Sequence, residues 1–375
     1  MAEPDLLIVG GGPAGLFGAI AARTRGLSAQ VIDARKPPLD KACGEGLMPD
    51  GAALLREHGV VLPQHRPFKG ISYHQGAIEV AGAFPEGYSG AGIRRVRLHE
   101  ALLRRAQELG VEVHWGAKAT ALLADPAGKR AGVSTAEGAR WGRWLVGADG
   151  LHSKIRAWAN LAGPETDWQR FGVRRHFAVA PWSDKVEVHW GPQAEAYVTP
   201  VGEAEIGVAF LWSGRKSSFD ALLQSFPALA ARLAGAVATS KDRGAGPLEQ
   251  RAKAVTQGRV LLLGDAAGYL DAITGEGLSL AFHQGAALAE ALAAGKPQNY
   301  AAACRDIVRW PERLTRLTLE LERRPALRAR VLRAFAADPA FFERFLAVHC
   351  RASSPARLFA PLFLARMMGR LVFLP

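Results

Sequence analysis

Glycines placed directly after apolar segments mark where this chain could do chemistry. The run Gly10-Gly11-Gly12-Pro13-Ala14-Gly15 follows the apolar segment Asp5–Val9. In such a run Gly10 permits a tight turn, Gly12 lets the backbone approach a phosphate, and Gly15 lets the next helix pack on its strand. The free amides at the start of that helix favour an anion. The pattern predicts a site for the pyrophosphate of a dinucleotide.

A carboxylate stands at the spacing that such a site requires. The segment Ala29–Asp33 is a second predicted strand, and Asp33 lies 23 positions after Gly10. An acidic residue near this spacing accepts hydrogen bonds from an adenosine ribose. The alternative for Asp33 is a solvated carboxylate in a turn.

Two later motifs extend the site. Gly147-Ala148-Asp149-Gly150 and Gly264-Asp265-Ala266-Ala267 each follow a short apolar run. A carboxylate such as Asp265 then lies at the carboxyl edge of the sheet, where ligands bind in open α/β folds. The run Thr274-Gly275-Glu276-Gly277 opens a helix. If the ligand is a flavin, the positive end of this helix would stabilise negative charge on the N1–C2=O side of the reduced isoalloxazine ring. The three motifs in this order indicate flavin-adenine dinucleotide (FAD), although Gly275 and Gly277 could also form a plain helix-entry turn.

The elements that position these motifs follow from apolar spacing. Strands are expected at 111–115, 144–149 and 260–263, and helices at 13–25, with proline in the first turn, 51–58, 98–109 and 277–294. Between residues 166 and 253 the spacing changes to period two, which indicates an antiparallel sheet. We therefore expect an α/β fold: a discontinuous Rossmann-like FAD-binding domain (1–65, 91–165 and 254–300), an inserted antiparallel β-sheet substrate domain (66–90 and 166–253) and a C-terminal helical region (301–375).

The expected sheet supplies candidates for a substrate pocket. Trp190, Phe210 and Trp212 are predicted either to contact a large hydrophobic substrate or to be plain core. Glu187 and His189 fall on the face opposite Trp190, where exposure to solvent is expected. No metal-ligand spacing stands out, so the metal expectation is none.

Together the three glycine motifs resemble the flavoprotein superfamily that includes p-hydroxybenzoate hydroxylase and the geranylgeranyl reductases, over residues 1 to about 300. The resemblance implies that the first glycine loop and Asp33 hold the ADP part, and that Asp149 and Gly150 belong to a motif contacting the cofactor and linked to nicotinamide binding. It also implies that Asp265 binds the ribityl chain and that Arg95 contacts the cofactor.

The branch of the superfamily is suggested by two loops. Lys41-Ala42-Cys43-Gly44-Glu45-Gly46-Leu47 and Thr274–Leu278 look like those of geranylgeranyl and menaquinone reductases, whereas Ala196–Pro200 departs from the Trp-x-Phe-Pro strand that those reductases often carry. The halogenase signature Trp-x-Trp-x-Ile-Pro is not found. Cys43 is the candidate catalytic residue, and the equal alternative is a thiol that packs or gates.

Three functions stay open on this resemblance. The first is an FAD-dependent oxidoreductase that reduces a C=C bond in a hydrophobic small molecule, with NAD(P)H docking transiently as electron donor. The alternative is a monooxygenase that hydroxylates an aromatic or polyketide substrate through a C4a-hydroperoxyflavin. A non-catalytic prenyl-binding protein is the remote third, since GDP dissociation inhibitors share the architecture.

Composition sets the location and the partners that we expect. The chain of 375 residues has a formal net charge of +12, and residues 301–375 hold 14 arginines, no lysine and 6 acidic residues. The basic, apolar segment Ser354–Arg370 predicts either peripheral membrane contact or a packed terminal helix. No nucleic-acid motif accompanies the charge. We find no secretory signal and no apolar run long enough to span a bilayer, and we expect three reduced thiols and a cytoplasmic protein.

Overall fold

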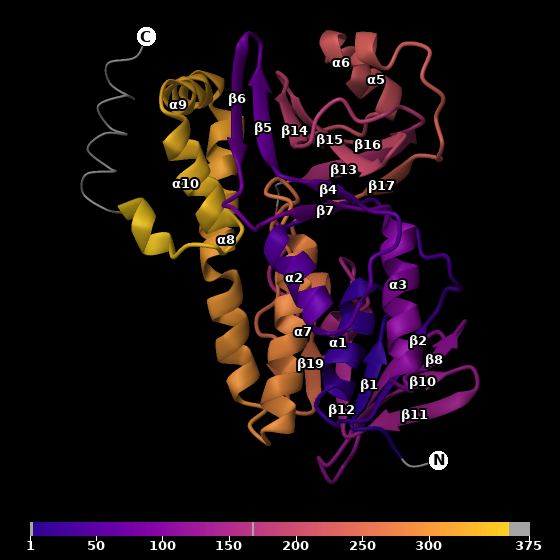
Figure 1. Cartoon of the computed structure of the whole chain (residues 1–375). Coiled ribbons are helices and arrows are strands. Elements are labelled where there is room, and N and C mark those ends of the chain that lie inside the picture. Colours follow the sequence, from indigo (N-terminus) through magenta and orange to yellow (C-terminus); the bar gives the residue numbers. More distant parts are fainter. Residues whose placement is uncertain (1–2, 167–168, 360–375) are drawn as a thin grey trace.

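The computed structural model describes residues 3–166 and 169–359. Figure 1 shows a cofactor domain in the lower half, a sheet domain above it, and long helices along one side of both. The fold expected from the sequence is confirmed: a Rossmann-like domain, a separate sheet built largely of antiparallel strands, and helices at the C-terminal end.

The inner strands of the central sheet of the cofactor domain are buried on both faces. Its strand order is β18-β19-β12-β1-β2-β8, and all neighbours pair in parallel except β18 and β19. In β1, Leu6 and Ile8 belong to the core under the helices, whereas Leu7 and Val9 belong to the core on the other face. This double burial explains the unbroken apolar sequence of the strand. The strands are β1 (Leu6–Val9), β2 (Ala29–Asp33), β8 (Glu112–Trp115), β12 (Trp144–Gly147), β18 (Thr256–Gln257) and β19 (Val260–Leu262).

Helices of the cofactor domain begin within a few residues of the predicted positions. Helix α1 starts at Pro13, with the proline in its first turn as predicted, whereas α3 starts at Arg95, three residues before the predicted start, because polar residues can continue an apolar stripe. The helices are α1 (Pro13–Arg23), α2 (Pro49–Glu57), α3 (Arg95–Glu108), α4 (Lys154–Trp158), the 3₁₀ turn η1 (Gly264–Ala267) and α7 (Gly277–Ala293).

Two small sheets complete the lower half. One has the order β11-β10-β9 and covers the face of the central sheet opposite α1; the other has the order β3-β7-β4 and lies where the chain passes between the two domains. Their strands are β3 (Gly46–Leu47), β4 (Arg66–Phe68), β7 (Gly90–Gly92), β9 (Ala121–Ala124), β10 (Ala131–Thr135) and β11 (Gly138–Gly142).

The upper sheet has the strand order β17-β13-β16-β15-β14-β5-β6. Its pairs are antiparallel except β14 with β5, which run in parallel because β5 arrives from an earlier part of the chain. Helices α5 and α6 cover one face (Figure 1). The elements are β5 (Gly70–Gln75), β6 (Ile78–Ala83), β13 (Arg170–Phe177), β14 (Val186–Trp190), β15 (Ala194–Gly202), β16 (Glu205–Ser213), α5 (Phe219–Gln224), α6 (Pro227–Arg232) and β17 (Arg243–Ala245).

The C-terminal part of the chain is helical, as predicted. Helix α8 (Asn299–Arg323) runs beside α7, and α9 (Pro325–Ala337) and α10 (Pro339–His349) pack on β6 before the short turn η2 (Pro355–Phe359). Residues 360–370 of the basic segment singled out above lie outside the described residues. Among the helices that the structure describes, none has the length and apolarity needed to cross a membrane.

Candidate functional site

The glycine turn between β1 and α1 is closed tightly against the middle motif. Gly10 has a φ of 116°, and a Cβ there would lie 2.2 Å from the carbonyl oxygen of Ala148. A Cβ on Gly15 would lie 1.9 Å from the carbonyl oxygen of Gly10. Both positions therefore require glycine. Residues 12–14, at the N-terminus of α1, line a cavity that runs toward the upper sheet.

Asp33 ends β2 beside this turn and is buried. Its Oδ2 accepts a hydrogen bond from the Gly11 amide at 2.9 Å, and its Oδ1 accepts one from the Arg35 amide at 2.8 Å. The carboxylate therefore holds the turn in shape. Asp33 is not among the described residues that line the cavity, so its contact with an adenosine ribose stays a prediction.

The middle and late motifs are joined through one arginine. Asp149 accepts hydrogen bonds from Ser153 Oγ at 2.5 Å and from two backbone amides of α4, which it thereby caps. Arg156 of α4 donates through Nη1 to the carbonyl oxygens of Asp265 and Ala266, at 3.3 and 3.2 Å. Asp149 and Asp265 both line the cavity. The two motifs thus form one wall.

Each of these motifs turns at a glycine with positive φ. Gly150 has a φ of 85° and lines the cavity next to Lys41 Nζ, which would lie 3.1 Å from a Cβ there. Gly264 has a φ of 64°, and its amide donates to Gln284 Oε1 at 2.9 Å, so α7 fixes the late turn.

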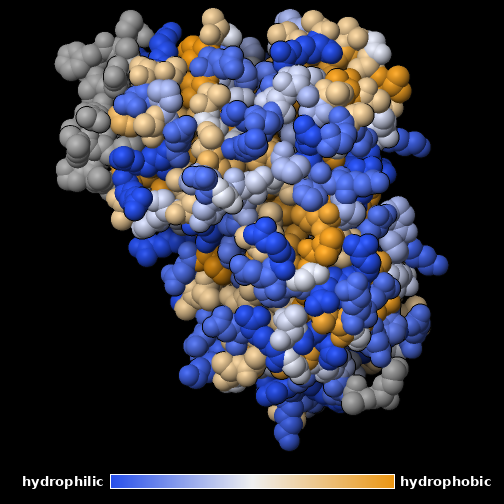
Figure 2. All heavy atoms as spheres, in the orientation of Figure 1, coloured by the Kyte–Doolittle hydropathy of each residue, from blue (hydrophilic) through white to orange (hydrophobic). Residues whose placement is uncertain are grey.

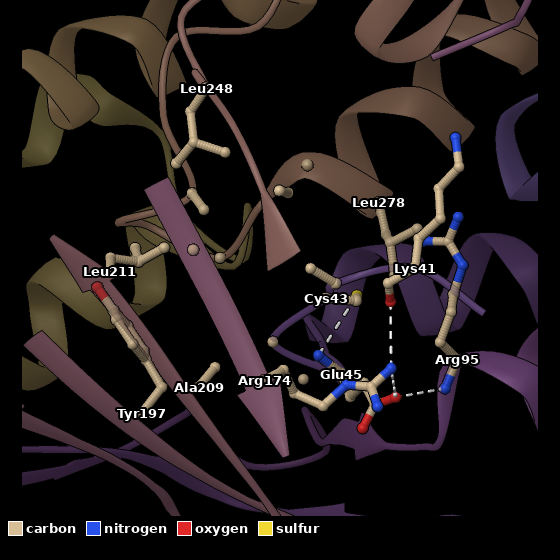
Figure 3. Close-up of a pocket in the computed structure, with 18 of the residues that line it drawn as sticks. Lys41, Cys43, Glu45, Arg95, Arg174, Tyr197, Ala209, Leu211, Leu248 and Leu278 are labelled. Atoms are coloured by element: carbon tan, nitrogen blue, oxygen red, sulfur yellow. Dashed lines mark hydrogen bonds and ion pairs between the residues drawn. The ribbon is translucent and has the colours of Figure 1, made fainter. Parts of the chain in front are cut away.

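Two cationic side chains converge on this end of the cavity. Figure 3 shows Lys41 and Arg95 side by side, and Arg95 Nη2 would lie 3.9 Å from a Cβ on Gly12. Burial, together with repulsion from Arg35 and Arg95, holds the pKa of Lys41 below its usual value. Arg95 Nε is buried and has no hydrogen-bond partner among the described residues. Partly unsatisfied cations beside a helix N-terminus fit the pyrophosphate of FAD.

Asp265 completes the polar end of the cavity. Burial raises the pKa of Asp265, while Arg95 and Lys41 nearby favour its carboxylate. An acidic side chain on the wall beside two cations fits a ribityl chain, whose hydroxyl groups donate hydrogen bonds. The residues present at this end therefore fit FAD, with Lys41, Arg95 and Asp265 as the side chains that would hold it.

The loop that carries Cys43 is clamped from both domains. Oε1 of Glu45 accepts a hydrogen bond from the Arg95 amide at 2.7 Å, and its Oε2 pairs with His176 Nε2. Arg174 Nη2 donates to Asp40 Oδ1 at 2.5 Å and lies 3.6 Å from Glu45 Oε1 (Figure 3). The loop position is thus fixed by buried charges on β13.

Cys43 lies on this clamped loop, half-buried and lining the cavity. Its Sγ accepts a hydrogen bond from the Glu45 amide at 3.4 Å. The thiol faces the space between the cationic end and the sheet, and its catalytic role stays a prediction.

The other end of the cavity is apolar. The cavity has a volume of about 560 Å³ and continues from the glycine turn to the upper sheet. Tyr197, Ala209 and Leu211 point into it from β15 and β16 (Figure 3), and the Tyr197 hydroxyl donates to the Ile273 carbonyl oxygen at 3.0 Å. Further apolar lining residues are Phe68, Ile71, Val186, Val188 and Leu248. In Figure 2, apolar side chains also gather at the junction between the two domains.

The aromatic residues proposed for the pocket lie elsewhere. Trp190 and Trp212 are not among the described residues that line the cavity. The Trp190 ring packs against Tyr73 and under Arg328, and the Trp212 ring packs against Phe171. Each is core: Trp190 belongs to the cluster that includes α9 and α10, and Trp212 to the cluster under α5 and α6.

Phe210 touches the cavity, but its ring packs on the other face of the sheet. The ring centroid lies 4.9 Å from that of Phe219 and 5.5 Å from that of Phe226, under α5 and α6. Strand β16 is apolar on both faces, and the apolar alternation in the sequence singled out the face of Phe210. The face that lines the cavity is the other one, which carries Ala209 and Leu211.

The glycine-rich entry to α7 closes the cavity from below. Gly275 has a φ of 71°, and Gly275 and Gly277 both line the cavity. Glu276 is the residue before α7 and is buried. Its Oε2 lies 3.4 Å from Nε2 of His349, the last residue of α10. The C-terminal helices thus reach the cavity.

A histidine-containing cluster lies on the outer face of the upper sheet. His74, Glu187 and His189 come together there because β5 and β14 pair in parallel with His74 opposite His189. Glu187 is buried rather than exposed as expected, since it accepts hydrogen bonds from Trp182 Nε1 at 2.9 Å and from His189 Nε2 at 3.0 Å. These two protein donors explain why the Glu187 carboxylate can be buried.

The charges on β13 escaped the sequence analysis. Arg170, Arg174 and His176 share one face of this strand, and all three are buried. The available signal was their period-two spacing within a strand of otherwise apolar character. Buried cations on a sheet face require partners, which directs attention to Asp40 and Glu45.

Comparison with known proteins agrees with this geometry. A family model described as an FAD binding domain matches residues 3–297. The chain belongs to this FAD-binding family. It is an FAD-dependent oxidoreductase, in keeping with the reductases and the monooxygenase among the relatives of this flavoprotein.

Curated relatives are similar at low identity. The flavoprotein is 28% identical to a menaquinone reductase of Mycobacterium tuberculosis over 310 residues, covering 77% of this chain and 76% of the relative. It is 27% identical to digeranylgeranylglycerophospholipid reductase 1 of Methanococcoides burtonii over 317 residues, covering 75% and 72%. It is 24% identical to pentachlorophenol 4-monooxygenase of Sphingobium chlorophenolicum over 307 residues, covering 74% and 56%.

Solved structures share the fold. A flavoprotein/dehydrogenase from Cytophaga hutchinsonii superposes with a TM-score of 0.83 at 17% identity, covering 98% of this chain and 100% of that one. Halogenase PltM in complex with phloroglucinol and FAD superposes with a TM-score of 0.69 at 18% identity, covering 81% and 72%.

Proposed function

We propose that this flavoprotein reduces a carbon–carbon double bond in a large hydrophobic molecule of isoprenoid type. The observation that carries the proposal is the apolar end of the cavity, which opens directly beside the Cys43 loop. Its aliphatic and aromatic lining suits a hydrocarbon chain. The menaquinone and digeranylgeranylglycerophospholipid reductases among the relatives support the same chemistry.

In this proposal the protein positions the cofactor and the substrate, and the cofactor carries the electrons. When bound and reduced, FAD would supply a hydride to one carbon of an activated or allylic double bond. Lys41 and Arg95 would hold its anionic part, and Glu45 with Arg174 fixes the loop that would face the substrate. The apolar wall excludes water from the reacting carbons.

The electron donor that we propose is NAD(P)H. The described residues contain one glycine turn of the dinucleotide-binding type, at Gly10, and it would hold FAD. A nicotinamide would therefore dock transiently at the cavity, in turn with the substrate.

Monooxygenation of an aromatic or polyketide substrate is the second candidate. The observation in its favour is the similarity to pentachlorophenol 4-monooxygenase. The same apolar cavity would admit an aromatic ring and would protect a reactive oxygen adduct from water.

Oxygen uptake measured together with NAD(P)H oxidation tests the choice. With a polyprenyl substrate present, we expect NAD(P)H oxidation to continue in anaerobic buffer, because the double bond accepts the electrons. Uptake of one oxygen molecule for each NAD(P)H, with an oxygen atom in the product, would instead establish the monooxygenase.

The partners that we propose are a hydrophobic small molecule and, peripherally, a membrane surface, but not nucleic acid. The basic charge of residues 301–375 supports a weak attraction to anionic lipid. Flotation with phosphatidylserine vesicles should recover the protein at low salt and lose it at high salt.

A further inference from the structure

The last long helix brings an imidazole into the cavity from outside the cofactor domain. Helix α10 approaches β6 closely at Gly82, where a Cβ would lie 2.6 Å from the Phe342 ring. This packing places His349 among the residues that line the cavity. His349 is 3% exposed; its Nδ1 has no hydrogen-bond partner among the described residues, and its Nε2 has only the long ion pair with Glu276. A buried imidazole with an unpartnered nitrogen is costly, so its place on the wall indicates that a ligand completes it.

Acidic groups face this imidazole from two elements. Glu276, at the entry to α7, places Oε2 at 3.4 Å from His349 Nε2. Asp50 of α2 lies farther off and already pairs with His283 at 3.0 Å and Arg351 at 3.3 Å. Glu276 is therefore the carboxylate that acts on His349 most directly.

The remaining titratable neighbours are neutral. Burial raises the pKa of Tyr73, on β5, to about 12 and that of Cys350 to about 11. Burial alone would disfavour the imidazolium of His349, but the Glu276 carboxylate, together with Asp50 and the Thr274 backbone, outweighs burial and raises the pKa of His349 above its ordinary value. The imidazole thus holds its proton to higher pH than a free histidine does. It lies on the wall of the cavity in which the proposed reaction needs a proton donor.

We propose that His349 protonates the substrate carbon next to the one that receives the hydride. This inference rests on the proposed reduction of a C=C bond. The carbon–carbon π bond breaks as one C–H bond forms from the flavin hydride and the other from the His349 proton. The flavin loses two electrons, the substrate gains them, and neutral His349 recovers a proton from water. NAD(P)H or dithionite then restores the reduced flavin.

The first test measures the proton on His349 without the cofactor. Two-dimensional ¹H–¹⁵N NMR of ring nitrogens, with His349→Gln to assign the signal, should give a pKa above about 6.5 in the unloaded protein. Glu276→Gln should lower it. A His349 pKa below that of a free histidine would overturn the proposal even if no catalytic variant folds.

The second test separates the two half-reactions. His349→Gln should keep its FAD and its rate of flavin reduction by NAD(P)H, while anaerobic reoxidation by the substrate slows by about 10²- to 10⁴-fold. His65→Gln, which changes an exposed histidine that bonds to the Leu62 carbonyl oxygen and does not line the cavity, is the matched control and should retain the wild-type rate. In the wild type the reoxidation rate should fall as pH rises through the His349 pKa.

The outcomes distinguish the role of His349 from the proposed function. If wild type reduces the double bond and His349→Gln reoxidises equally fast, the proton-donor role is overturned and the proposed function stands. If reduced wild type transfers no hydride to any polyprenyl substrate, the proposed function is overturned and the role of His349 falls with it.

Discussion

Glu45 and Arg95 are tied directly to each other: the Glu45 carboxylate accepts a hydrogen bond from the Arg95 amide at 2.7 Å. The link joins the Cys43 loop to the start of α3, where the Arg95 side chain reaches toward Gly12. His176 Nε2 pairs with the same carboxylate from the upper sheet, and Arg174 Nη2 lies 3.6 Å from it. One acidic side chain therefore links the Cys43 loop to both domains.

Replacing this carboxylate should destabilise the protein. Glu45→Gln leaves the shape but removes the charge that Arg174 and His176 face, and breaking such a buried pair costs about 3 kcal/mol. Urea unfolding measures the loss. Glu203→Gln, at an exposed pair with Arg66, is the control and should change stability by about 1 kcal/mol or less. If the two variants lower the free energy of unfolding equally, the buried Glu45 carboxylate contributes no more to stability than the exposed one.

The cationic end should govern cofactor affinity. Lys41→Met and Arg95→Met each remove a positive charge from the cationic end of the cavity, so the Kd for FAD should rise roughly 10- to 100-fold. Fluorescence titration of the unloaded protein with FAD measures this Kd. Arg97→Met changes a neighbouring arginine that bonds to the Gln64 carbonyl oxygen, and it should leave the Kd unchanged. An unaffected Kd in the first two variants would remove them from the cofactor site.

Neighbouring residues on β16 should separate the two faces of the sheet. Leu211→Trp fills the cavity and should weaken binding of a polyprenyl ligand at least tenfold while FAD content stays normal. Trp212→Leu alters the face under the helices, and it should lower the melting temperature without changing ligand affinity. Perturbation of the flavin absorbance by the ligand gives both affinities. The reverse pattern would mean that the cavity lies on the other face.

Buried Glu195 should make stability depend on pH. Arg170 Nη2 lies 2.9 Å from its Oε2, yet burial prevails and raises the pKa of Glu195 from 4.5 to about 7. Because the folded pKa is raised, this contribution to stability is fully present below about pH 4.5 and is lost as pH rises through about 7. Glu195→Gln should therefore lose less stability than wild type between about pH 5 and pH 8. Urea midpoints that fall in parallel would contradict the assignment.

Sequence predicted the parts of the site that local geometry determines. Gly10 and Gly15 are required by contacts within a single β–α turn, and an apolar strand before a glycine signals its own burial. For this reason the cofactor domain and its FAD could be predicted before the structure was known.

Contacts between residues far apart in the sequence could not be predicted from local patterns. Glu45 meets His176 across 131 positions, and His349 meets Glu276 from a different helix. Periodicity also could not tell which apolar face of β16 is the cavity wall, since Phe210 packs under helices and Leu211 faces the cavity on the same strand.

Anaerobic single turnover with an isolated product tests the proposed reaction most directly. The protein, reduced stoichiometrically with dithionite, is mixed with a geranylgeranyl lipid in the absence of oxygen, and both the flavin spectrum and the product mass are followed. We predict that the flavin is reoxidised and that the lipid gains two hydrogen atoms at one double bond. A flavin that stays reduced until oxygen is admitted, with an oxygen atom then appearing in an organic product, would contradict the reductase and leave the monooxygenase.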